Sequence, residues 1–278
     1  MSEQLVVEDL RVRFQSAHRV VDAVRGVSFS VGREKVGIVG ESGSGKSMTA
    51  RAILRLTPPQ AQMTAKTLRF QDIDLAAASE RQMLKVRGRR ISMIMQDPKF
   101  ALDPVMRVGD QIAEAIPADR RGGRAQDRER VLAMLDSVQI RDPKRVFDLY
   151  PHEVSGGMGQ RIMIAMMLMP EPSLLIADEP TSALDVTVRV RVLAILDELA
   201  AQRDLGLMFI SHDLNLVASF CDRVLIMYAG RVVEQCKASE LAHAQHPYTR
   251  GLLASLPRVG DTRARLPVLT RDPAWLSS

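Results

Sequence analysis

The stretch GESGSGKS, residues 40–47, directly follows the apolar run of residues 36–39 and decides the fold. Its glycines leave the backbone bare, so N–H groups can point at an anion, and a helix starting there adds its dipole. The spacing G-x-x-x-x-G-K-[ST] is that of a phosphate loop (Walker A), and the alternative is a plain glycine turn. The predicted nucleotide-binding residues are Gly40, Glu41, Ser42, Gly43, Ser44, Gly45, Lys46, Ser47 and Met48.

The chemistry of this loop follows from its parts. Gly43 and Gly45 allow close approach of the backbone to phosphate. Lys46 supplies a point charge for the β- and γ-phosphates, and the hydroxyl of Ser47 is a ligand for Mg²⁺.

Outward from the loop, strand and helix patterns alternate, which favours an α/β protein with a mainly parallel sheet. Valine-rich or alternating runs at the N-terminus predict an antiparallel hairpin, and a helical middle predicts an inserted subdomain at about 104–169. Residues 118–126 are expected to form a mobile loop. Strands are expected at 5–14, 20–31, 36–39, 68–70, 91–95, 174–177, 207–210, 224–227 and 231–234, and helices at 46–56, 104–150, 161–169 and 186–201.

Composition limits the classes of function. The 278 residues carry a net charge of +5, but acidic residues are interleaved with the basic ones, which favours an ordinary charged surface over a nucleic-acid or membrane patch. Aromatic residues make up 4%, so the core must consist of aliphatics and of the 15 methionines. Two cysteines predict neither a disulfide framework nor a metal cluster. No signal peptide is expected, and the apolar run 162–169 is too short to cross a bilayer.

Two acids end the apolar run of residues 174–177. Asp178 and Glu179 are unfavourable at the end of a buried strand unless they have a role there. Asp178 suits a contact with Mg²⁺, and Glu179 suits a general base that orients water. Many strands end in Asp, so the pair gains its meaning from the phosphate loop upstream.

Ser155, Gly156 and Gly157 precede a further helix, and a serine there caps free N–H groups while glycines leave the backbone open. An ordinary N-cap is the alternative. One nucleotide cannot easily use two helix starts of one chain, but two chains facing each other can. Gln96, the run 182–185 and His212 each follow a predicted strand or the acidic pair, and each taken alone is compatible with a structural role.

Taken in order, these segments resemble the nucleotide-binding subunit of an ATP-binding cassette (ABC) transporter, over residues 5–257. The SGG stretch separates this family from other phosphate-loop ATPases. The stretches GIVGESGSGKS, SMIMQDP, YPHEVSGGMGQR, LLIADEPTSALDVTV and HPYTRGLLASLP resemble the peptide/nickel importer branch. The resemblance implies an ABC ATPase domain over 1–257 and a C-terminal tail over 258–278.

The resemblance also implies roles for individual residues. In a head-to-tail dimer with two ATP molecules between the chains, Ser155, Gly156 and Gly157 would contact the γ-phosphate of the partner's nucleotide. Gln96 would reach Mg²⁺ and the attacking water. The remaining implied roles are the catalytic base for Glu179, a γ-phosphate contact for His212, communication across the interface for Asp185, and stacking on adenine for Phe14, for which a place in the core is the alternative.

The family pattern implies partners as well: transmembrane permease subunits, a second ABC ATPase subunit that is a paralogue, a solute-binding protein that acts indirectly, and no nucleic acid. The chain would lie on the cytoplasmic face of the inner membrane, and its cofactors would be ATP and Mg²⁺. Gly159 departs from the family pattern, in which a larger residue usually stands at this position. Glycine in a first helical turn is also up to ~1 kcal/mol less favourable than alanine. No cysteine follows Cys236, so no iron–sulfur cluster is expected.

Two other functions stay open from the sequence. One is an ABC-type ATPase that acts on nucleic acid or ribosomes, although such proteins usually carry two cassettes or a coiled-coil insert. The other is a catalytically weak half of a heterodimeric transporter ATPase, which Lys46, Glu179 and His212 argue against.

Overall fold

A computed structural model describes residues 3–15, 20–98, 101–182, 184–256, 272 and 275. The chain forms two compact units, one made of residues 1–77 and 209–278 and the other of residues 78–208. Strand β9 (Gly206–Ser211) contains the boundary between them. Only two residues of the predicted tail 258–278 belong to the described part of the chain.

The first unit contains an antiparallel sheet in the order β2-β1-β5-β6, with β4 also paired to β1. Alternating buried residues such as Leu10, Val12 and Val27 face its core, which explains the register of the N-terminal hairpin. The elements of this unit are β1 (Leu5–Gln15), β2 (Val20–Val31), β3 (Lys35–Val39), α1 (Lys46–Ile53), β4 (Ala61–Thr64), β5 (Thr67–Phe70), β6 (Ile73–Asp74), α8 (Leu214–Phe220), β10 (Arg223–Tyr228), β11 (Arg231–Lys237), η4 (Ala238–His243) and α9 (Pro247–Ser255).

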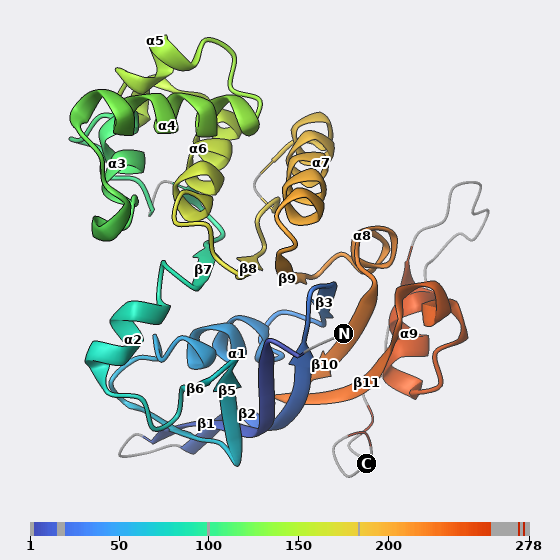
Figure 1. Cartoon of the computed structure of the whole chain (residues 1–278). Helices are drawn as coiled ribbons and strands as arrows, with labels where there is room; N and C mark the ends of the chain where they lie inside the picture. Colours follow the sequence, from blue (N-terminus) through green and yellow to red (C-terminus); the bar gives the residue numbers. More distant parts are fainter. Residues whose placement is uncertain are drawn as a thin grey trace. The chain divides into compact units, whose positions relative to one another are not determined.

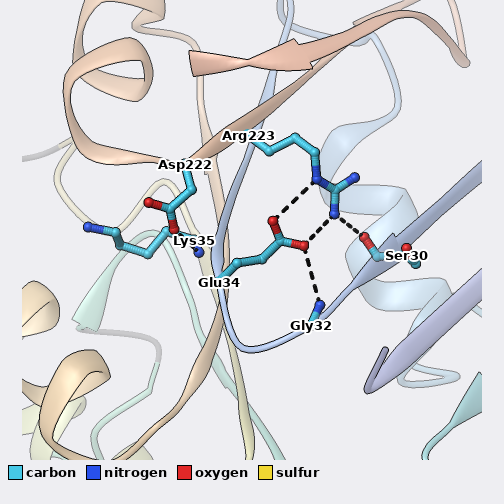
Figure 2. A network of polar contacts seen from close by, with 6 residues as sticks. All are labelled: Ser30, Gly32, Glu34, Lys35, Asp222 and Arg223. Carbon is cyan, nitrogen blue, oxygen red and sulfur yellow. Dashed lines mark hydrogen bonds and ion pairs between the residues drawn. The ribbon is translucent and has the colours of Figure 1, made fainter. Parts of the chain in front are cut away.

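The same unit brings distant parts of the sequence together. Strand β3 pairs in parallel with β10, which pairs antiparallel with β11, the two being joined by a short turn at residues 229–230. Arg223 at the start of β10 forms an ion pair with Glu34 at 2.6 Å and donates to the carbonyl oxygen of Ser30 at 2.6 Å (Figure 2). The Lys35 N–H donates to the carboxylate of Asp222. These contacts fix the start of β10 beside the strand that leads into the phosphate loop.

The second unit is mainly helical, with β7 and β8 paired in parallel. Helix α6 (Gly156–Leu168) lies beside α3 (Val108–Glu114) and α4 (Arg124–Ser137) (Figure 1). It is buried along much of its length, and Ile162, Met163 and Ile164 are fully inaccessible. Its elements are α2 (Glu80–Val86), β7 (Ile91–Ile94), α3 (Val108–Glu114), η2 (Ala118–Arg120), α4 (Arg124–Ser137), α5 (Pro143–Phe147), η3 (Pro151–Glu153), α6 (Gly156–Leu168), β8 (Leu174–Asp178) and α7 (Val186–Gln202).

The fold class agrees with the prediction: an antiparallel β part, parallel strand pairs and helices. Several boundaries were predicted wrongly, among them strand β11, which ends at Lys237 instead of residue 234, and three helix ends. Helix α1 ends at Ile53 instead of residue 56, α6 begins at Gly156 instead of residue 161, and α4 begins at Arg124, within the predicted loop 118–126. Buried methionines contribute to the core as expected, among them Met83, Met163 and Met227. None of the helices in the described ranges is long and apolar enough to span a bilayer.

Candidate functional site

The phosphate loop joins the buried strand β3 to helix α1 in the first unit. Gly43 and Gly45 have φ values of +80° and +100°, in the region that favours glycine. A Cβ on Gly43 would meet no atom within 4 Å, whereas one on Gly45 would lie 2.6 Å from the carbonyl oxygen of Ala23. The loop therefore exposes backbone at Gly43 and is tightly packed at Gly45.

Lys46 is the first residue of α1 and is 5% exposed. Its ammonium donates to the carbonyl oxygens of Gly40 and Glu41 at 2.7 and 2.9 Å, so it lies across the loop. A buried ammonium needs such partners. No side chain in the described part of the chain caps the N-terminus of α1. The loop thus combines a fixed positive charge with a helix start, the arrangement that binds phosphate.

Phe14 and His212 also belong to the first unit. Phe14 lies in β1, opposite Val21 of β2 and Ala61 of β4, and its side chain is half-buried. It is therefore not a fully buried core residue. His212 is exposed and lies between β9 and α8.

Glu179 and Gln96 meet in the second unit. Asp178 ends β8 with 6% exposure, and Glu179 follows it with a φ of +49°. Residues other than glycine rarely adopt this conformation, and such strain clusters at functional sites. The Ser182 hydroxyl donates to the Glu179 carbonyl oxygen at 3.1 Å, which holds the turn. The Gln96 amide donates to the Glu179 carboxylate at 3.3 Å, across 83 residues of sequence.

The SGG stretch forms the start of α6. The Ser155 hydroxyl accepts the Met158 N–H at 3.3 Å, so the predicted N-cap is present. A Cβ on Gly156 would meet no atom within 4 Å, but one on Gly157 would lie 2.7 Å from the side chain of Val188 in α7. Gly157 therefore allows α6 to approach α7 closely.

Asp185 caps α7 by accepting the Val188 N–H at 2.9 Å. The caps of α6 and α7, Ser155 and Asp185, line one open cavity of about 1140 Å³ in the second unit. Arg161 and Arg191 also line it, and burial together with the charges of Arg191 and Arg141 lowers the pKa of Arg161. The cavity thus combines two helix starts with a mixed set of charges, since Asp136, Asp142 and Asp185 line it beside Arg141, Arg161 and Arg191. The sequence reading missed these arginines, although Arg161 follows the SGG stretch closely.

The comparisons with known proteins identify the class. Residues 24–182 match the family described as ABC transporter. The chain is 51% identical over 270 residues to the probable peptide ABC transporter ATP-binding protein y4tR of Sinorhizobium fredii, covering 95% of this chain and 80% of that protein. It is 44% identical to the dipeptide transport ATP-binding protein DppD of Bacillus subtilis, covering 100% of this chain and 84% of that protein.

A solved structure shows the same fold. A dimeric ATP-binding cassette with bound ADP and Pi superimposes with a TM-score of 0.72 at 24% identity, covering 84% of this chain and 98% of that one. The fold and the phosphate loop are those of an ATP-binding cassette. The chain belongs to the ABC transporter family, and the predicted ATPase activity agrees with this membership.

Proposed function

We propose that this chain is the ATP-hydrolysing subunit of an ABC importer that energises uptake of a peptide, nickel or a similar small solute through a membrane permease. The observation that carries the proposal is the meeting of Gln96 with Glu179 at the end of β8. A half-buried carboxylate, held in an uncommon backbone conformation beside an amide, suits a base that orients water. The two relatives, named as ATP-binding proteins of peptide and of dipeptide transport, support the solute class.

The phosphate loop, residues 40–48, would hold the ATP phosphates, and Lys46 would turn its ammonium to the β- and γ-phosphates. Phe14 would stack on adenine, because its half-buried ring offers a face. The Ser155, Gly156 and Gly157 start of α6 would bind the γ-phosphate of a nucleotide held by a partner chain. His212 would contact the γ-phosphate of the chain's own nucleotide, and Asp185 would communicate across the interface.

Mg²⁺ fits the donor groups proposed for it. The Ser47 hydroxyl, the Gln96 amide oxygen and the Asp178 carboxylate are hard oxygen ligands of the kind that Mg²⁺ prefers. When bound, the ion would neutralise phosphate charge. Glu179 would accept the proton of the attacking water, and Gln96 would orient that water.

The domain division belongs to the same proposal: an ABC ATPase domain over 1–257, with a helical subdomain at about 104–169 that meets the permease, and a tail over 258–278. The partners would be the permease subunits and a second ATPase subunit, a paralogue, with a solute-binding protein acting indirectly. The chain would lie peripherally on the cytoplasmic face of the inner membrane.

Mg²⁺-dependent ATP hydrolysis and ATP binding by four variants test this function. Glu179→Gln should keep ATP binding and lose turnover, while Glu198→Gln, on the exposed face of α7, should behave like the wild type. Lys46→Ala should lose ATP affinity, while Lys85→Ala on α2 should not. Retained turnover in Glu179→Gln would remove Glu179 from the role of base. Binding without turnover in the wild type would indicate that a paralogous subunit completes the site.

A further inference from the structure

The C-terminal stretch of residues 246–256 contacts the phosphate loop directly. Tyr248 is fully buried, and its hydroxyl oxygen accepts the backbone N–H of Glu41 at 3.2 Å. Glu41 is the second residue of the loop, and its carbonyl oxygen accepts from the Lys46 ammonium. Glu41 is therefore held at its backbone N–H by Tyr248 and at its carbonyl oxygen by Lys46.

The position of Tyr248 is itself well determined. It lies in the first turn of α9, where its N–H donates to Nδ1 of His246, the N-cap of the helix. The carboxylate of Glu234 in β11 accepts the N–H groups of Gln245 and His246. The start of α9 is thus attached to β11, and the phenol has little freedom to leave the loop.

The turn between β10 and β11 supports the loop beside Tyr248. The N–H of Gly230 donates to the carbonyl oxygen of Ser44 at 3.0 Å. A Cβ on Gly40 would lie 2.1 Å from the carbonyl oxygen of Met227, so loop and strand end are in close contact. The ring of Tyr228 packs on that of Tyr248 with centroids 4.5 Å apart.

Trp275 extends this packing into the C-terminal tail. Its ring centroid lies 5.8 Å from that of Tyr228 and 5.9 Å from that of Tyr248. Trp275 thus contacts both rings of the aromatic pair, and one of the two, Tyr248, bonds to the phosphate loop.

We propose that Tyr248 is a positioning residue for ATP binding: its hydroxyl holds the Glu41 peptide so that the loop keeps its phosphate-binding conformation. This inference rests on the proposed nucleotide site at residues 40–48. Without the hydroxyl, the Glu41 N–H loses this acceptor and the loop populates other conformations. Apparent affinity falls in proportion to the competent fraction, whereas the chemistry of the bound state is unchanged.

The test compares Tyr248→Phe with Tyr228→Phe in the full chain. Both remove one phenolic oxygen and keep the ring, but among the described residues only the Tyr248 hydroxyl forms a hydrogen bond with the loop. ATP affinity is measured by calorimetry in EDTA, so that hydrolysis does not interfere, and KM and kcat are measured with Mg²⁺. Tyr248→Phe should raise the Kd and KM for ATP about three- to tenfold, the range that one neutral hydrogen bond supplies, and leave kcat unchanged. Tyr228→Phe should stay within about twofold of the wild type.

Lys46→Ala separates failure of this inference from failure of the proposed site. If Lys46→Ala loses binding while Tyr248→Phe keeps the wild-type Kd, Tyr248 has no positioning role. If Lys46→Ala itself binds ATP normally, the nucleotide site is elsewhere and both proposals fail. Equal losses of affinity in Tyr248→Phe and Tyr228→Phe, with equal losses in thermal midpoint, would reduce the role of Tyr248 to general packing and overturn the inference.

Discussion

Gly159 in helix α6 provides a test of the helix propensity and packing at a single position. It is the fourth residue of a helix that is otherwise deeply buried, and glycine is a poor helix former. Within the described part of the chain, a Cβ built there would touch only Pro98, at 3.7 and 3.8 Å, which is ordinary van der Waals contact. We expect Gly159→Ala to stabilise the protein.

The expected gain has two sources. Replacing glycine by alanine in a helix contributes about 0.8–1.0 kcal/mol. Burying the added methyl group against Pro98 contributes up to about 0.8 kcal/mol. The sum is about 1–2 kcal/mol in the free energy of unfolding, since the contact with Pro98 adds no steric cost.

Gly157→Ala, two residues earlier in the same helix, is the matched control. There the new Cβ would lie 2.7 Å from a methyl group of Val188, and such overpacking costs typically about 1–3 kcal/mol. The gain in helix propensity should be cancelled or reversed. Gly156→Ala, where the Cβ meets nothing within 4 Å, reports the propensity effect without packing.

Urea unfolding followed by far-ultraviolet circular dichroism measures all three variants. With an m-value of about 3 kcal/mol/M, Gly159→Ala should raise the midpoint by about 0.3–0.7 M without changing m. A lower midpoint for Gly159→Ala, or an equal rise for Gly157→Ala, would show that the packing around α6 differs from the structure and would refute the reasoning.

Two further predictions concern the first unit. Burial raises the pKa of Cys221 to about 12, so its thiol should stay neutral and unreactive at pH 8. A thiol reagent should therefore label the half-buried Cys236 first. Faster labelling of Cys221, read by peptide mass spectrometry, would contradict its burial. Arg223→Met should lower the free energy of unfolding by about 2 kcal/mol, between the ranges for exposed and buried ion pairs, because Glu34 loses its guanidinium partner. The double variant with Glu34→Gln should recover part of that loss, and a fully additive double variant would show that the two side chains do not interact.

Local signals in the sequence predicted much of the phosphate-loop region. The spacing of Gly43, Gly45 and Lys46 specifies a turn into a helix without reference to other parts of the chain, and the structure has that turn. The cap at Ser155 is equally local, since a serine before glycines satisfies N–H groups within one turn. A role for Asp178 and Glu179 at the end of the strand was predicted because acidic residues are unfavourable next to a buried apolar run.

The missed boundaries have identifiable causes. Helix α1 ends at Ile53, and Arg55, two residues later, adopts the left-handed conformation. The Leu56 N–H then donates to the carbonyl oxygen of Arg51. Glycine usually occupies the left-handed position after a helix, so an arginine there gave no sequence signal for the end of the helix. Helix α4 starts early because the Asp127 carboxylate accepts the N–H of Gly122, and this hydrogen bond lies within a stretch whose polarity resembles a loop.

The contact of Tyr248 with Glu41 could not follow from any local pattern, because 207 residues separate the partners. The stretch HPYT was conspicuous in the sequence only as a family feature, and a buried tyrosine needs an acceptor or donor for its hydroxyl wherever it lies. Strand pairing supplies the connection: β10 lies beside β3, and β3 leads into the loop. A C-terminal segment that follows β10 and β11 is therefore delivered to the loop by the topology itself. The same argument predicts that substitutions in residues 246–256 change ATP affinity before they change catalysis, because Tyr248 in this segment bonds to the backbone of the loop.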